Sequence, residues 1–149
     1  MKIHFVCSGN TNRSRMAEAY MNSKQIPGVT ATSSGIHADD NLNGDICWYT
    51  KIILDEAGLW QYTFPTWTKT TKELLAANDL IIFMQEEHSN FVQRKLRYIP
   101  PQFEIWNVSD VIGAGFFQTA RSKARMLQKD REIFEKIKEK VNSLADRLA

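Results

Sequence analysis

Near the N-terminus, a cysteine and an arginine, Cys7 and Arg13, enclose five small or polar residues. The five are Ser8, Gly9, Asn10, Thr11 and Asn12. A short apolar run precedes Cys7, and a helical pattern follows Arg13, so we expect this segment to be a loop between a strand and a helix.

Such a loop can curl around one tetrahedral oxyanion, because its backbone N–H groups point inward and the helix N-terminus adds partial positive charge. The same positive field favours a thiolate at Cys7, and the thiolate is the form of cysteine that acts as a nucleophile. The planar guanidinium of Arg13 can donate to two oxygens of one anion. The stretch therefore predicts an anion site with a nucleophile.

The composition of the 149 residues, with 43% hydrophobic and 24% charged, is that of an ordinary globular protein. A formal net charge of +2 gives no argument for nucleic acid or a membrane surface as a partner. No apolar run approaches the ~20 residues of a membrane helix, and the N-terminal apolar segment is too short for a signal peptide. We expect a single domain over residues 1–149 and a cytoplasmic location. We expect a monomer or a weak homodimer, for which Trp48, Trp60 and Trp67 leave room.

The cysteines and histidines show no pattern of metal ligands. His4, His37 and His88 are scattered, and no Cys/His cluster has zinc-ligand spacing. Cys7 and Cys47 could form one disulfide, but a cytoplasmic chain favours a free thiol with a chemical task at Cys7. Cys47 is expected to be a packing residue of a helix. We predict neither a metal nor another cofactor.

Strand-like and helical segments alternate along the chain. The expected strands are residues 3–6, 29–33, 80–84 and 104–108, and the expected helices are residues 15–22, 46–57, 71–77, 86–97 and 119–148. This alternation predicts an α/β fold, a three-layer sandwich with a central four-stranded parallel sheet and helices on both faces. The first helix is expected to be capped by Ser14. Cys7 and Asp110 each follow a predicted strand, so both should lie at the sheet edge where such folds bind ligands.

The segment from Val6 to Ser14, followed by Met16-Ala17-Glu18, resembles the signature of the low-molecular-weight protein tyrosine phosphatases. The resemblance extends to Ser33-Ser34-Gly35, to Asn78 through Met84 and to Asp110, over nearly the whole chain. It implies a phosphatase with a phosphate-binding loop after the first strand. The implied substrate is a phosphorylated protein residue, with phosphotyrosine as the first choice.

The resemblance also implies a role for individual residues. Cys7 would attack phosphorus and form a phosphocysteine, while Arg13 and the loop N–H groups stabilise the developing charge. Asp110 would protonate the leaving oxygen and then deprotonate the attacking water. Residues 8–12 would form the phosphate-binding loop together with Ser14, which hydrogen-bonds the cysteine sulfur. Asn10 and Ser33 would support this loop, and no metal is required.

Several loop residues depart from the family pattern. Asn12 stands where the family usually has a second cysteine, which can form a protective disulfide with the nucleophile. Arg15 replaces a proline at the helix start, and we expect it to add a cation near the anion site. Pro65 lies roughly where a family histidine helps to tie the loop, and Gln85 replaces an aspartate.

The expected pocket walls depart from the pattern as well. Val111 replaces the proline after Asp110, and the aromatic residues that usually follow are absent, with Ile112, Phe116 and Phe117 as the only candidates nearby. Asp39 or Asp40 falls where a pocket aromatic is often found. Fewer aromatic walls weaken the case for stacking a phosphotyrosine ring.

Other functions remain open on the sequence. Family members with a threonine at the position of Thr11 resemble phosphoarginine phosphatases, whereas an aliphatic residue suits phosphotyrosine. A catalytically weak phosphate- or phosphoprotein-binding module is a further alternative, although such a module has no chemical need for Cys7, Arg13 and Asp110 together. A thiol-dependent arsenate reductase is disfavoured, because the segment after Met84 lacks the cysteines that this chemistry needs.

Overall fold

The computed structural model describes residues 1–40, 42–111 and 119–148. Its strands are β1 (Lys2–Cys7), β2 (Thr30–Gly35), β3 (Leu80–Phe83) and β4 (Phe103–Ile105). Its α-helices are α1 (Arg13–Ser23), α2 (Trp48–Glu56), α3 (Lys72–Ala76), α4 (Glu86–Lys95) and α5 (Ala120–Leu148). Two short 3-10 helices, η1 (Ala38–Asp40) and η2 (Trp60–Tyr62), lie before and after α2.

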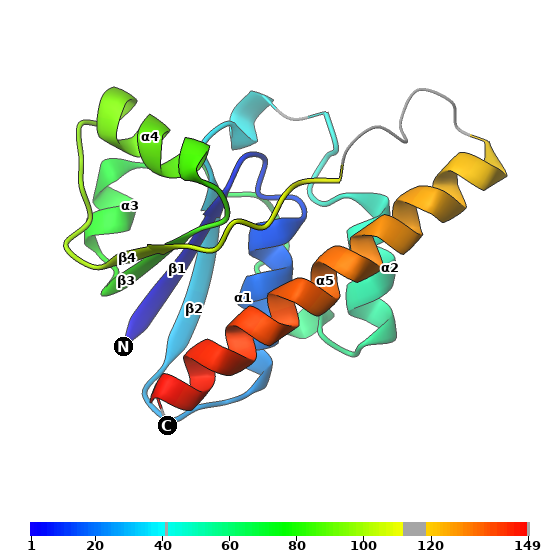
Figure 1. Ribbon diagram of the computed structural model, residues 1–149, viewed down its shortest axis with the longest axis horizontal. Coiled ribbons are helices and arrows are strands. Elements are labelled where there is room, and N and C mark those ends of the chain that lie inside the picture. The colour runs from blue at the N-terminus through cyan, green and yellow to red at the C-terminus, as the bar shows by residue number, and fades with distance from the viewer. Residues whose placement is uncertain (41, 112–118, 149) are drawn as a thin grey trace.

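The strands form one parallel four-stranded sheet in the order β2-β1-β3-β4. Helices α3 and α4 lie on one side of this sheet, and α1 and α5 lie on the other (Figure 1). The predicted α/β three-layer fold is therefore confirmed. From β1 the chain crosses to β2 on one side and later to β3 on the other, so the loop after β1 opens where the strand order reverses, as in other open α/β sheets that bind ligands.

Alternate side chains of the central strands supply two separate hydrophobic cores. From β1, Ile3 and Phe5 pack with α1 and α5, whereas Val6 packs with α3 and α4. In β3, Ile82 belongs to the first core and Ile81 to the second. Both strands are almost fully buried, as expected for parallel strands covered on both faces.

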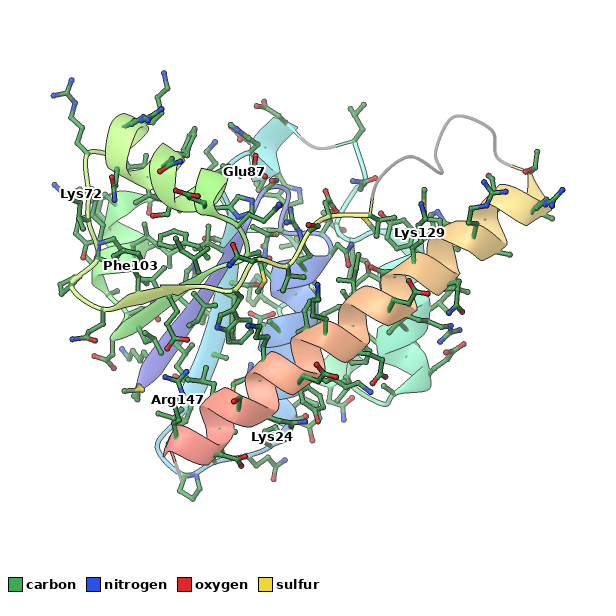
Figure 2. The ribbon with its side chains drawn as sticks, in the orientation of Figure 1. Lys24, Lys72, Glu87, Phe103, Lys129 and Arg147 are labelled. Atoms are coloured by element: carbon green, nitrogen blue, oxygen red, sulfur yellow. The ribbon has the colours of Figure 1, made fainter. Side chains whose placement is uncertain are left out.

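Helix α5 buries one apolar stripe against the first core. Its buried hydrophobic residues are Phe134, Ile137, Val141, Leu144 and Ala145. Near its C-terminal end, Arg147 lies 2.9 Å from a carboxylate oxygen of Glu104 in β4. The first part of α5, marked by Lys129 in Figure 2, extends past the sheet, and the exposed polar side chains of residues 120–129 follow from this position.

Ser14 does not cap α1, contrary to the sequence-based prediction. The helix begins at Arg13, two residues earlier than predicted, with Asn12 in the N-cap position and no side-chain cap. The physical reason is that the Ser14 hydroxyl already contacts Cys7 Sγ at 2.9 Å and accepts from Asn10 Nδ2 at 2.8 Å.

Strand β4 is shorter than the predicted segment 104–108. It ends at Ile105, although Trp106 N still donates to Phe83 O and Val108 N to Met84 O. Asn107 has a φ of 57°, in the left-handed region, and this turn breaks the regular strand.

The charge of Arg15 lies near the anion site, as the sequence led us to expect, and interacts with Cys7, but Glu18 is its stronger partner. The side chain is fully buried behind the loop, with Nε 4.0 Å from Glu18 Oε2. Burial raises the pKa of Glu18, although hydrogen bonds and the charge of Arg15 lower it. The Arg15 guanidinium donates to the carbonyl oxygens of Asn10, Asp45 and Phe64 and to Thr63 Oγ1.

We expect Arg15→Met to lower the free energy of unfolding by about 3–5 kcal/mol, because it leaves the buried Glu18 carboxylate without a counter-charge. Urea denaturation measures this loss. Arg131→Met is the matched control, since Arg131 pairs with Glu56 on the surface and should contribute little. Equal losses in the two variants would contradict a structural role for the buried pair.

Candidate active site

The loop after β1 curls around the sulfur of Cys7. The Cys7 side chain is 3% exposed, and its Sγ lies 2.9 Å from Ser14 Oγ. Asn10 N donates to the same sulfur at 3.3 Å. Two donors therefore converge on Cys7 Sγ, the arrangement that stabilises a thiolate.

Asn10 has a φ of 55°, and this left-handed turn is fixed by its own side chain. Asn10 Nδ2 donates to Ser14 Oγ at 2.8 Å and to Ser33 Oγ at 2.9 Å. Asn10 Oδ1 accepts from Thr68 N at 2.8 Å. The side chain thus ties the loop to α1, to β2 and to the segment before α3, which offsets the cost of its unusual backbone.

Gly35 permits the close approach of the loop to β2. A Cβ at this position would lie 2.5 Å from Ser8 O and 2.7 Å from Asn10 N, both backbone atoms. A side chain cannot fit there unless the loop moves. In the sequence, Gly35 was only one residue of a segment that resembles the family. The structure gives the steric reason why a glycine is needed at this position.

Arg13 is held by neutral partners. Its Nη1 donates to Gln85 Oε1 at 2.5 Å and to Val108 O at 2.9 Å, and the residue is 2% exposed. Gln85 orients the guanidinium as an aspartate would, but without neutralising it. The positive charge of Arg13 therefore remains available to an anion.

Asp110 faces the same pocket. Its Oδ2 lies 3.8 Å from Arg13 Nη2, its side chain is 54% exposed, and its Oδ1 accepts from Val111 N at 2.8 Å. The carboxyl group therefore stands at the mouth of the site rather than turned away from it. The candidate aromatic residues Phe116 and Phe117, and Ile112, lie outside the described residues.

A pocket of about 350 Å³ opens above the loop. Tyr49 of α2 supplies an aromatic ring, although its spacing in the sequence fitted a core-facing position. Of the two candidate aspartates, Asp40 lines the pocket, whereas Asp39 forms an ion pair with Lys69 at 2.8 Å. The full lining is Cys7, Ser8, Gly9, Thr11, Asn12, Arg13, His37, Asp40, Asn43, Cys47, Tyr49, Asp110 and Val111.

His88 supports the loop from α4, a role that the sequence did not reveal. Its Nδ1 accepts from Gln85 N at 3.0 Å, so Nε2 carries the proton and donates to Ser8 Oγ at 2.9 Å. Burial, with a smaller effect of the Arg13 charge, lowers the pKa of His88 to about 3. The uncharged ring of His88 therefore supports the loop through its hydrogen bond to Ser8. Its position three residues after Gln85, in a capping box, is the local signal that could have indicated it.

Cys47 contacts the loop at Thr11. Cys47 N donates to Thr11 O at 3.1 Å, and Cys47 Sγ donates to Thr11 Oγ1 at 3.4 Å. Burial raises the pKa of the Cys47 thiol, and both cysteines are free. Cys47 thus holds the loop in addition to packing in the core.

The comparisons with known proteins agree with this geometry. A family model described as low molecular weight phosphotyrosine protein phosphatase matches residues 2–149. A protein-arginine-phosphatase from Geobacillus stearothermophilus is 41% identical over 58 residues, which cover 39% of this chain and only 38% of that protein. A YwlE mutant from Bacillus subtilis has a TM-score of 0.70 at 25% identity, covering 97% of this chain and 99% of its own. SP-PTP, a low molecular weight protein tyrosine phosphatase from Streptococcus pyogenes, has a TM-score of 0.76 at 19% identity, covering 99% and 93%.

The chain therefore belongs to the low molecular weight phosphotyrosine protein phosphatase family. In residues 1–40, 42–111 and 119–148, no helix has the length and apolar character needed to cross a membrane. Over the same described residues, no group of three or more His, Cys, Asp or Glu side chains could hold a metal ion.

We expect Gly35→Ala to lower kcat/KM for an aryl phosphate on the order of 100-fold, because the added methyl displaces the loop that positions the anion. Vanadate affinity should fall with it. Gly58→Ala is the control: its φ of 70° makes alanine unfavourable there, but no atom lies within 4 Å of the added Cβ. That variant should lose about 1–2 kcal/mol of stability and keep its activity. Normal turnover by Gly35→Ala would show that the close approach is unimportant.

Proposed function

We propose that the protein is a cysteine-dependent phosphatase that hydrolyses a phosphorylated protein side chain through a phosphocysteine intermediate. The observation that carries this proposal is the convergence of Cys7, Arg13 and Asp110 on one pocket. A nucleophile, a charge-stabilising group and a proton donor are the groups that this reaction requires. A module that only binds phosphate needs neither the first nor the last.

In the first step, the phosphate oxygens accept hydrogen bonds from the loop N–H groups and from Arg13. The Cys7 thiolate, to which Ser14 Oγ–H and Asn10 N–H donate, attacks phosphorus. A P–S bond forms while the bond from phosphorus to the leaving atom breaks. Asp110 gives its proton to the leaving atom, so the product departs in its protonated form.

In the second step, Asp110 removes a proton from water, and the resulting nucleophile attacks phosphorus. The P–S bond breaks, inorganic phosphate forms, and Cys7 returns to the thiolate. Arg13 stabilises the same developing charge in both steps. Because the thiol must stay reduced, and both cysteines are free, we expect the protein to act in the cytoplasm.

Cys7→Ser should abolish hydrolysis of p-nitrophenyl phosphate while retaining phosphate binding, because only the nucleophile is lost. Asp110→Asn should lower kcat by roughly 10²–10⁴-fold through loss of the proton donor. Asp39→Asn is the matched control, since Asp39 pairs with Lys69 outside the pocket and should leave kcat unchanged. If wild-type protein shows no hydrolysis under reducing conditions from about pH 5 to 7, the phosphatase proposal is rejected in favour of a phosphate-binding module.

Two phosphorylated residues are candidate substrates. Phosphotyrosine is supported by the ring of Tyr49 on the pocket wall, which offers an aromatic contact for the phenol.

Phosphoarginine is supported by different features of the same pocket. Asp40 and Asp110 at its rim complement the positive charge of a guanidino group, and the relative from Geobacillus stearothermophilus is named a protein-arginine-phosphatase. Thr11 is the loop residue that the sequence associates with this activity.

Matched peptides that carry phosphotyrosine or phosphoarginine at the same position would distinguish the two substrates. If phosphoarginine is preferred, Asp40→Asn should lower kcat/KM for that peptide and leave the phosphotyrosine value nearly unchanged, because only the guanidino group is cationic. Thr11→Ile should shift the ratio in the same direction. A phosphotyrosine preference in the wild type that both substitutions leave unaltered would reject phosphoarginine.

A further inference from the structure

A buried carboxyl group, Asp130 of α5, lies behind the phosphate-binding loop and has no part in the scheme above. Asp130 and Thr50 of α2 are both 0% exposed, and Asn12 of the loop is 5% exposed. These three side chains join the loop to two helices. The family usually has a cysteine at position 12. A cysteine has no amide group there, so the connection through Asn12 is a feature of this chain.

The hydrogen bonding among the three side chains is incomplete. Thr50 Oγ1 lies 3.1 Å from Asn12 Oδ1 and 3.3 Å from Asp130 Oδ2. The hydroxyl has one hydrogen, so it cannot donate fully to both acceptors. Among the described residues, Asn12 Nδ2 and Asp130 Oδ1 have no hydrogen-bond partner. Buried groups left in this state are unfavourable.

A proton on Asp130 resolves the conflict. The neutral acid donates through Oδ2–H to Thr50 Oγ1, and the Thr50 hydroxyl then donates to Asn12 Oδ1. When Asp130 is ionised, the Thr50 hydroxyl turns to the carboxylate, because a charged acceptor is the stronger one. Asn12 Oδ1 then loses the Thr50 donor, while the Asn12 amide interacts with the carboxylate instead. The protonation state of Asp130 thus decides which side of the Asn12 amide is held.

The surroundings of Asp130 favour its neutral form. Burial raises its pKa to about 7, and the negative charge of Asp110 adds to this effect, although interactions with Asn12 and Thr50 lower it. Cys47 and Tyr49 face it from α2, and both have raised pKa values.

Two cations, Lys129 and Arg131, flank Asp130 in α5. Arg131 is paired with Glu56 at 2.7 Å. Lys129, labelled in Figure 2, lines the groove beside Asp110. A phosphate dianion in the adjacent loop would oppose ionisation of Asp130 further.

We propose that Asp130 is a positioning residue of the phosphate-binding loop, which in its neutral form holds Asn12 through Thr50 and so couples anion binding to the uptake of a proton. The inference rests on the proposed function only in that residues 7–14 bind the phosphate group. Asp130 touches neither substrate nor reacting atoms. It acts on the loop conformation from which the N–H groups bind the anion.

Sulfate binding to the Cys7→Ser protein tests the proposal. Sulfate stays a dianion between pH 6 and 8, whereas phosphate itself titrates in this range, and the Cys7→Ser background removes the thiol. Calorimetry in buffers of different ionisation enthalpy measures the protons taken up. We expect proton uptake near pH 7 and a loss of sulfate affinity of up to about tenfold from pH 6 to pH 8.

Asp130→Asn in this background retains a donor for Thr50 at every pH. Most of the proton uptake should disappear, and the affinity should change by less than about twofold over the same range. Asp55→Asn, which removes the same charge from an exposed ion pair of α2, should behave like the parent protein. If Asp130→Asn retains the parent's pH dependence, the proposal is overturned.

Thr50→Val distinguishes the hydrogen-bond link between Asp130 and Asn12 from direct charge repulsion between Asp130 and the bound anion. It also tests the proposal if Asp130→Asn does not fold. The carboxyl group remains in this variant, but its link to Asn12 is lost, so proton uptake should fall as in Asp130→Asn. Undiminished uptake would overturn the relay through Thr50. Since the readout is binding, an inactive enzyme does not affect it. Failure of the Cys7→Ser parent protein to bind sulfate would count against the proposed function instead.

Discussion

At Asn10 the backbone turns with a φ of 55°, and the N–H group of this residue donates to Cys7 Sγ. A loop of inward-pointing donors repels itself when it is empty, so the rest of the structure must hold it from outside. Asn10 provides the first support with its own side chain, through Ser14, Ser33 and the backbone of Thr68. The absence of a side chain at Gly35 then lets β2 lie against the turn.

The groups around the loop are polar but largely uncharged. His88 braces Ser8 as a neutral ring, Gln85 holds Arg13 without neutralising it, and the buried charge of Arg15 is directed to Glu18. An anion in the pocket therefore meets the charge of Arg13 with little competition. The exceptions among the described residues are Asp40 and Asp110 at the rim of the pocket, and Asp110 is the proposed proton donor.

Local patterns predicted the parts of the site that lie close together in the sequence. The strand, loop and helix around Cys7 and Arg13 could be expected from apolar runs and small residues, and the buried strand β3 and the apolar stripe of α5 from periodicity. The supports could not, because they depend on which residues the topology brings near the loop. Tyr49 has the spacing of a core residue, and His88 and Asp130 have no motif around them. A cation near the anion site could be expected at Arg15, but its position beside the loop did not reveal that Glu18 and three carbonyl groups would enclose it.

The loop is among the first segments of the chain to be synthesised, and its supports are among the last. Arg13 bonds to Val108, 95 residues away, while Ser8 bonds to His88 and Thr50 to Asp130 over 80 residues each. Contacts of such sequence separation form late, because the intervening chain must first be ordered. A nascent or partly folded chain thus contains Cys7 but not the contacts that surround it in the folded protein. Under the proposed function, activity is consequently a measure of completed folding, and a truncation that removes α5 would disable the proposed nucleophile more than 100 residues away.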